Sequence, residues 1–297
     1  MDHITSLRKR IKKILGKKNK YQWIKITASS DSLFFEDGGG FQSRHASIRK
    51  LCEKAYEITD KSRLTSPCSF AVYTGDTPSS EAPWNGVKIR SIAEISAKLE
   101  SHAFPDWVYG GWPEVGIADY HEMASTLYEA GQKAPMSSVV FWRGAITHPS
   151  RKLFLEKIEN DPRFDAKVIV WEKVEGQTAL VAKHFASLPD HAGYSTLIDL
   201  EGAGYSGRIK LLLHTGRPLI LPDRPLWDWP LHKLESFVHY IPVRRDLEDL
   251  SEKVDWIVAN KERAESIGRA GAAFARKYLT EENAVRRISE IFSEEVL

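Results

Sequence analysis

The stretch from residue 194 to residue 213 carries residue types that could hold a phosphate group. An apolar segment is followed by a glycine-containing turn, residues 202–207, and then by a leucine-rich segment that begins at Arg208. Glycines let a backbone approach a ligand, and a helix N-terminus offers free N–H groups and a dipole that favours negative charge. Ser206 can add a hydroxyl donor and Arg208 a forked cation. The alternative is a turn that only joins a strand to a helix.

A second pair of cations flanks another strand-to-helix turn. Arg143 and Gly144 end the apolar strand expected over residues 138–142, and Arg151 precedes a helix expected from residue 152. Two arginines in this arrangement are typical of an anion site. They are also compatible with ordinary surface cations.

A carboxylate lies directly after the strand expected over residues 69–74. Asp76 stands in a turn that contains Gly75 and Pro78. The carboxyl end of a strand is where catalytic groups of open α/β folds collect. Taken alone, Asp76 is better explained as a turn former or a helix cap.

The segment 104–114 is dense in aromatic, glycine and acidic residues, and it fits no regular element. Its candidate ligand-binding residues are Asp106, Trp107, Trp112 and Glu114. Aromatic faces combined with carboxylates are suited to sugar rings and their hydroxyls, although such aromatic residues also simply pack a loop.

Short apolar segments alternate with helical patterns, which indicates parallel sheets in an α/β fold. Strands are expected over residues 69–74, 138–142, 166–171, 197–200, 217–221 and 237–243. Helices are expected over residues 45–56, 91–101, 152–159, 178–187, 246–259, 261–278 and 281–294. The pattern on both sides of residue 140 suggests two such halves with a cleft between them.

Composition is that of a soluble globular protein, with 42% hydrophobic and 28% charged residues. The two cysteines, Cys52 and Cys68, have no metal-ligand spacing and are too few for a disulfide scaffold. No apolar run reaches the roughly 18 residues of a membrane span.

Positive charge is concentrated at the start of the chain. Residues 1–20 contain eight Lys/Arg against Asp2, a local charge of +7. Apolar residues recur at helical spacing over residues 3–16, which predicts a basic amphipathic helix. Such a helix can lie on an anionic membrane surface, or it can be a solvated helix packed on the body. Nucleic acid is not the expected partner, because the rest of the chain does not spread cations and aromatics over its surface.

Several ordered blocks give the chain a family resemblance. The blocks are Phe104-Pro-Asp-Trp107, Gly111-Trp-Pro-Glu114, Trp142-Arg-Gly144, Gly204-Tyr-Ser-Gly-Arg-Ile-Lys210 and His239-Tyr-Ile-Pro-Val243. Together they resemble glycosyltransferase family 90. That family includes protein O-glucosyltransferases, fungal capsule xylosyltransferases and bacterial lipopolysaccharide-modifying enzymes.

The resemblance implies a GT-B architecture, with two Rossmann-like domains facing a central cleft. The domains would be the basic helix over 1–20, an acceptor-side domain over 21–137, a nucleotide-sugar-binding domain over 138–279, and a C-terminal helix over 280–297 that could pack back on the acceptor-side domain.

The resemblance also implies roles for individual residues. Asp76 would be the general base of an inverting transfer from a UDP-sugar, and this reaction would need no metal and no cofactor. The donor would be bound by Arg143, Gly144, Arg151, Gly204, Tyr205, Ser206, Gly207 and Arg208. Asp106, Trp107, Trp112 and Glu114 would contact the acceptor or the sugar.

A basic N-terminal segment on a cytoplasmic protein fits synthesis of a bacterial surface glycan. The expected acceptor is a glycolipid such as lipopolysaccharide core, at the inner face of the cytoplasmic membrane. Two other hypotheses are a non-catalytic protein that binds glycans or nucleotide-sugars on the same fold, and another nucleotide-dependent α/β enzyme.

Overall fold

The computed structural model describes residues 22–173 and 180–295, which divide into two compact units. The first unit contains the described residues through Asp119 together with the segment from Glu281, and the second contains Tyr120–Thr280. The boundary lies before α4 (Tyr120–Gln132) and not at residue 137, because α4 packs on α7 (Ile209–His214) of the second unit. The helix predicted over residues 1–20 lies outside the described residues.

The first unit has a four-stranded sheet of order β2-β1-β3-β4. Its strands are β1 (Trp23–Ala28), β2 (Leu33–Asp37), β3 (Cys68–Tyr73) and β4 (Lys88–Ser91). Strand β1 pairs antiparallel with both β2 and β3, and only β3 and β4 run parallel. The expectation of a parallel, Rossmann-like sheet is therefore wrong for this unit. A tight turn from Ser29 to Ser32 joins β1 to β2 as a hairpin, which forces them to be antiparallel.

Two long helices belong to the same unit as this sheet. They are α2 (Gln42–Ile58) and α10 (Glu281–Glu294), which pack on each other. Lys54 of α2 donates to Glu281 at 2.6 Å, and Phe292 of α10 contacts Phe70 of β3. The helix expected over 91–101 is instead divided between β4, β5 (Ala93–Glu94), a 3-10 turn and the short α3 (Leu99–His102).

The second unit contains a five-stranded sheet of order β13-β11-β10-β6-β7. Its strands are β6 (Ser137–Gly144), β7 (Phe164–Val168), β10 (Tyr194–Ile198), β11 (Leu219–Pro222) and β13 (Ile241–Val243). Every neighbouring pair is parallel. The chain is therefore a mixed α/β protein with a parallel sheet, as the alternating pattern predicts.

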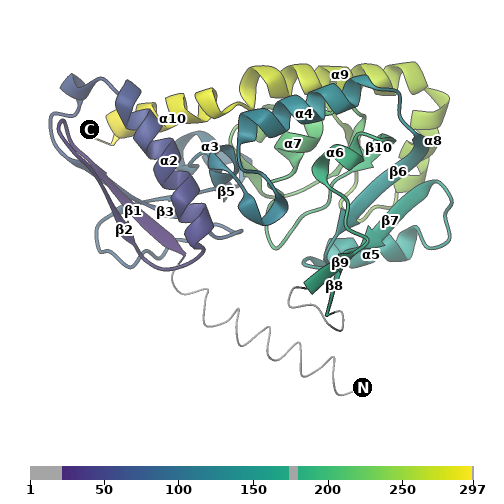
Figure 1. Ribbon diagram of the computed structural model, residues 1–297, viewed down its shortest axis with the longest axis horizontal. Helices are drawn as coiled ribbons and strands as arrows, with labels where there is room; N and C mark the ends of the chain where they lie inside the picture. The colour runs from purple at the N-terminus through teal and green to yellow at the C-terminus, as the bar shows by residue number, and fades with distance from the viewer. Residues whose placement is uncertain (1–21, 174–179, 296–297) are drawn as a thin grey trace. The chain divides into compact units, whose positions relative to one another are not determined.

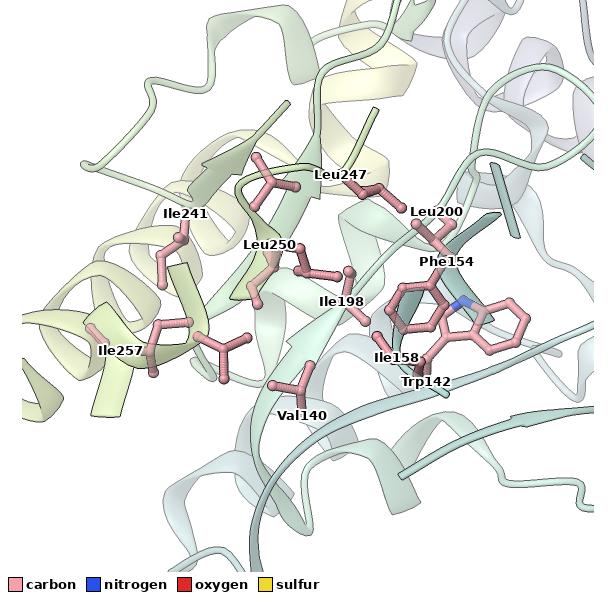
Figure 2. Packing of buried hydrophobic residues seen from close by; sticks show 14 of the residues in the cluster. Val140, Trp142, Phe154, Ile158, Ile198, Leu200, Ile241, Leu247, Leu250 and Ile257 are labelled. Atoms are coloured by element: carbon pink, nitrogen blue, oxygen red, sulfur yellow. The ribbon is translucent and has the colours of Figure 1, made fainter. Parts of the chain in front are cut away.

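Alternate residues of these strands build the main core of the second unit. Val140 and Trp142 of β6, Ile198 of β10 and Ile241 of β13 belong to one buried cluster, 14 residues of which are drawn in Figure 2. The helices of this unit include α5 (Pro149–Lys157), α6 (Leu188–His191), α8 (Leu250–Ala259) and α9 (Lys261–Tyr278). Helix α7 contacts both α4 and α9 (Figure 1).

Two segments of the second unit differ from the sequence-based prediction. The strand expected over 237–243 is limited to its last three residues, because Phe237 adopts a left-handed backbone with φ of 58°. The prediction of a helix over 178–187 is wrong. Residues Leu180–Lys183 form β9, which pairs antiparallel with β8 (Val170–Lys173). Within the described part of the chain, no helix is both long and apolar enough to cross a bilayer.

Candidate functional site

The parallel sheet of the second unit has one point where the strand order reverses. From β6 the chain continues to β7 on one side, whereas β10, β11 and β13 extend on the other side. Ligands of open α/β sheets bind in the crevice at such a point, outside the carboxyl ends of the strands. The loops after β6 and β10 border this crevice, and both carry residues selected from the sequence.

A buried carboxylate organises the loop after β10. Asp199 follows the last residue of the strand and has no exposed surface. Its Oδ1 accepts from Ser206 Oγ at 3.0 Å and from Arg208 Nη2 at 3.0 Å. Its Oδ2 accepts from Arg224 Nη1 at 3.4 Å, and its backbone carbonyl accepts from Arg224 Nη2 at 3.1 Å.

Arg151 joins the same cluster through backbone carbonyls. From the first turn of α5 it donates to Glu201 O at 2.8 Å, Leu200 O at 3.2 Å and Ala145 O at 2.8 Å. The loops after β6 and β10 are therefore tied together by one side chain. A Cβ atom at Gly144 would lie 2.7 Å from the Trp142 ring and 3.3 Å from the Arg151 guanidinium, which explains the glycine there.

This cluster carries a net positive charge. Burial, together with the nearby Arg208 and Arg224, lowers the pKa of Arg151 to about 10, and Asp199 opposes this shift. Burial alone would raise the pKa of Asp199, but the attraction of Arg208, Arg224 and Arg151 outweighs it, and this pKa is lowered. Three guanidiniums around one carboxylate leave an excess of positive charge that an anion can neutralise.

The three cations differ in how accessible they are. The Arg208 side chain is 17% exposed, whereas the Arg224 side chain is 1% exposed. Arg208 also donates from Nη1 to Arg143 O at 2.6 Å, so it links the two loops at the crevice. Arg208 is therefore the cation of this cluster best placed to contact a ligand.

Arg143 was also selected from the sequence, but the structure does not bring its side chain to the cluster. Its Nη2 lies 2.9 Å from both carboxylate oxygens of Asp165, and its guanidinium lies 4.3 Å from the centre of the Phe141 ring. Only its backbone carbonyl reaches Arg208. The reason is the alternation of β6, which directs Arg143 to the face opposite Trp142.

The glycine turn itself is mostly buried and locally bonded. Tyr205 is 6% exposed, and its carbonyl accepts from Gly202 N at 3.3 Å. Ser206 uses its hydroxyl hydrogen for Asp199, so it is a support of the cluster rather than a free donor. The helix that follows, α7, has only six residues, and its dipole is correspondingly weaker than the sequence suggested.

A buried ion pair supports the end of this turn, at Gly207. Lys210 Nζ lies 2.6 Å from Asp228 Oδ2, and both side chains are almost fully buried. The same ammonium donates to Gly207 O at 3.2 Å. The turn that bears Ser206 and Arg208 is thereby anchored to the segment 227–228.

The first unit contains the second group of candidate residues. Asp76 lies just after β3, and its side chain is 38% exposed. Its Oδ1 accepts from Arg44 Nη1 at 3.0 Å. The ring of Trp107 lies against the same guanidinium, 4.8 Å from its centre. Asp76 and Trp107, which are distant in sequence, are thus brought together around the first turn of α2.

The other residues of the aromatic segment have varied environments. Asp106 is fully buried and caps the 3-10 helix Trp107–Gly110 by accepting from Val108 N, which is a structural role. Trp112 packs edge-on against Trp107, with ring centres 5.1 Å apart. Glu114 is exposed and accepts from Ser43 Oγ at the start of α2.

Three residues of these sites escaped the sequence analysis. Asp199 and Arg224 each come one or two residues after a buried strand, and this position could have identified them. Arg44 offers no such signal, because it lies in an ordinary helical segment. Among the residues that the structure describes, no group of three or more His, Cys, Asp or Glu side chains is arranged to hold a metal ion.

Comparison with known proteins decides the family. The model for glycosyl transferase family 90 matches residues 96–294. The chain belongs to glycosyl transferase family 90. The residues of the Asp199 cluster and of the aromatic segment all lie inside the matched range, whereas Arg44 and Asp76 precede it.

Several of the curated relatives are protein O-glucosyltransferases. Protein O-glucosyltransferase 1 of Bos taurus is 27% identical over 204 residues, which is 63% of this chain and 52% of the relative. Protein O-glucosyltransferase 2 of Danio rerio is 32% identical over 146 residues, or 47% of this chain and 28% of the relative. This family 90 chain spans about half the length of the first of these relatives, and less of the second.

One solved structure similar to this family 90 chain is that of Anabaena Alr3699/HepE in complex with UDP-glucose. It aligns with a TM-score of 0.37 and 12% sequence identity, covering 62% of this chain and 46% of the other.

Proposed function

We propose that this chain is an inverting glycosyltransferase that uses a UDP-sugar, with glucose, xylose or a related sugar as the transferred group. The acceptor is a hydroxyl of a bacterial surface glycan such as lipopolysaccharide core. The observation that supports this proposal best is the Asp199 cluster. In a member of glycosyl transferase family 90, Arg208, Arg151 and Arg224 gather excess positive charge at the crevice between β6 and β10.

In this proposal the diphosphate of the donor lies beside Arg208. The bond between the anomeric carbon and the diphosphate oxygen breaks during transfer, so negative charge grows on the leaving group. Fixed cations in a partly buried site stabilise such charge more strongly than water does. These cations would perform the task that a divalent metal performs in other transferases, and we therefore propose that the reaction is metal-independent.

Asp76 of the first unit is the proposed general base. The acceptor hydroxyl attacks the anomeric carbon as the nucleoside diphosphate leaves, and its proton passes to a carboxylate oxygen of Asp76. A positioned carboxylate can contribute on the order of 10²–10⁴-fold to the rate of such a step. Trp107, Trp112 and Glu114 would contribute to acceptor or sugar binding. The second unit would be the nucleotide-binding half of a GT-B enzyme.

The proposed reaction is tested by UDP release from a panel of UDP-sugars, with purified lipopolysaccharide core as acceptor and EDTA present. We expect release with one donor, with the anomeric configuration inverted in the product. Asp76→Asn should lower kcat at least about a hundredfold without weakening UDP binding. Asp60→Asn, an exposed aspartate of the same unit, is the matched control and should be fully active. UDP binding without transfer from any donor would instead indicate a nucleotide-sugar-binding protein.

We also propose that residues 1–20 bring the enzyme to the inner face of the cytoplasmic membrane. The basis is the local charge of +7, at roughly 1 kcal/mol per cation near an anionic surface. Flotation with vesicles containing anionic lipid should recover the full chain but not a chain lacking residues 1–20. Equal recovery of both would refute this part of the proposal.

A further inference from the structure

Arg44 binds the turn that carries Asp76 at two points. Its Nη1 donates to Asp76 Oδ1 at 3.0 Å and to Thr74 O at 2.5 Å. One guanidinium therefore fixes both the side chain of Asp76 and the backbone two residues before it. Among the described residues, the structure shows no partner for the second carboxylate oxygen, Oδ2, which is available to a ligand.

The guanidinium of Arg44 is itself tightly held. It lies 4.5 Å from the centre of the Phe41 ring and 4.8 Å from the centre of the Trp107 ring. The side chain is only 15% exposed, whereas that of Asp76 is 38% exposed. Stacking on aromatic faces restricts a planar guanidinium to one orientation, which a lysine ammonium cannot reproduce. Arg44 is thus the more rigid partner of the pair.

The next residue of α2 holds the same turn from another side. His45 is fully buried, and its Nε2 lies 3.3 Å from Thr74 Oγ1. Its Nδ1 lies 2.9 Å from Asp37 Oδ1. The other carboxylate oxygen of Asp37, Oδ2, accepts from Arg49 Nη2 at 2.7 Å. Two consecutive residues of one helix therefore bond Thr74, one through its carbonyl and the other through its hydroxyl. This makes the start of α2 a rigid support for Asp76.

We propose that Arg44 is the positioning residue of the general base: it anchors Oδ1 of Asp76 and leaves Oδ2 oriented to take the proton of the acceptor hydroxyl. The inference rests on the proposed function, in which Asp76 is the base. Arg44 touches neither the donor nor the transferred proton in this role. It acts through Asp76 alone, and this determines which experiments can test it.

Loss of Arg44 should therefore affect turnover rather than donor binding. A displacement of about 1 Å of a catalytic group can cost on the order of a hundredfold in rate. For Arg44→Ala we expect kcat to fall ten- to a hundredfold, with the KM for the UDP-sugar and the affinity for UDP changed less than about twofold. Arg44→Lys should recover only part of kcat, because lysine lacks the planar fork. Guanidinium at millimolar concentration should partly restore Arg44→Ala.

Lys25→Ala is the matched control. Lys25 is a partly buried cation of the same unit, it pairs with Glu36 at 2.6 Å and lies 5.9 Å from the centre of the Trp84 ring, and it belongs to none of the hydrogen bonds that hold Thr74 and Asp76. Its replacement should lower stability about as much as Arg44→Ala while leaving kcat within about twofold. Melting temperatures of both variants would separate loss of folding from loss of position.

The decisive comparison is made in the background of Asp76→Asn. If Arg44 acts only through Asp76, Arg44→Ala should lower the residual kcat of Asp76→Asn less than about twofold. Two results would overturn the positioning role alone. One is that Arg44→Ala lowers kcat by the same factor in the wild type and in Asp76→Asn. The other is that Arg44→Ala keeps the full kcat while Asp76→Asn is inactive. Full activity of Asp76→Asn would overturn the proposed base, and the role of Arg44 with it.

Discussion

Arg208 and Asp199 are joined by two hydrogen bonds to one carboxylate oxygen, from Nη2 at 3.0 Å and from Nε at 3.3 Å. The same arginine donates its remaining Nη1 to Arg143 O at 2.6 Å. A single guanidinium therefore connects the ends of β6 and β10 at the point where the strand order reverses. Arg208 was selected from the sequence as a ligand contact. Its position shows that it also supports the site, because it holds the two loops together.

The first prediction concerns Asp199→Asn. Removing one partner of a buried charge pair leaves an uncompensated charge, so the free energy of unfolding should fall by about 3 kcal/mol. The arginines keep their bonds to backbone carbonyls, and they lose a competing negative charge. UDP should therefore bind the variant at least as tightly and raise its melting temperature more than that of the wild type. A folded variant that no longer binds UDP would show that Asp199 is needed to place the guanidiniums.

The second prediction compares two arginines. Arg208→Ala removes the accessible cation of the cluster, and its affinity for UDP should fall roughly ten- to a hundredfold, the range for a hydrogen bond to a charged group. Arg143→Ala should change this affinity less than threefold, because the Arg143 guanidinium is bound by Asp165. Isothermal titration of both variants with UDP measures the difference. Equal losses would mean that the Arg143 side chain also contacts the nucleotide.

The third prediction addresses the buried pair Lys210–Asp228. Lys210→Met leaves Asp228 buried without this cation, so the free energy of unfolding should fall by about 3–5 kcal/mol. Lys152→Met removes an exposed pair with Glu156 and should leave chemical denaturation nearly unchanged. Equal denaturation midpoints for the two variants would contradict the role of Lys210 as the anchor of the turn.

The fourth prediction is a pH dependence of stability. Burial, assisted by Arg208, lowers the pKa of His191 from 6.5 to about 4. Between these values the unfolded chain binds more protons than the folded one, so the stabilisation that comes from keeping this histidine neutral is lost as pH falls from 6.5 to 4. The total effect is about 3 kcal/mol.

Urea denaturation at several pH values in that window checks this prediction. His191→Phe should reduce the slope of stability against pH, by at most about 1.4 kcal/mol per pH unit. Leu188→Ala on the same short helix should lower stability without changing the slope. An unaltered slope in His191→Phe would assign the pH dependence to other groups, of which His214, with a pKa also lowered to about 4 by burial, is the first to examine.

The second unit was the more predictable part of the chain. Strands β6 and β11 contain continuous apolar runs, as expected for a sheet buried on both faces, and the carboxyl end of β10 identifies the loop that bears Arg208. The first unit was less predictable, because hairpin pairing of β1 and β2 depends on a four-residue turn without a glycine signal. Alternation along a strand does not reveal whether its neighbour is parallel or antiparallel.

The candidate sites were also only partly predictable from the sequence. Spacing and residue type found Arg151, Ser206 and Arg208, which share one cluster, but they could not show that Ser206 donates to Asp199 or that Asp165 binds Arg143. Both facts depend on side chains from other strands. Arg44 was missed because an arginine in a helix has many uses, and only the tertiary packing brings it to Asp76.

The most direct test of the central proposal is a comparison of UDP, UMP and uridine binding to the wild-type chain in EDTA. If the Asp199 cluster binds a diphosphate, removing the β-phosphate should weaken binding at least tenfold, about 1.4 kcal/mol, and uridine should bind more weakly still. The difference between UDP and UMP should shrink in Arg208→Ala. Equal affinities of the wild type for UDP and UMP would contradict the assignment of this cluster to the donor diphosphate.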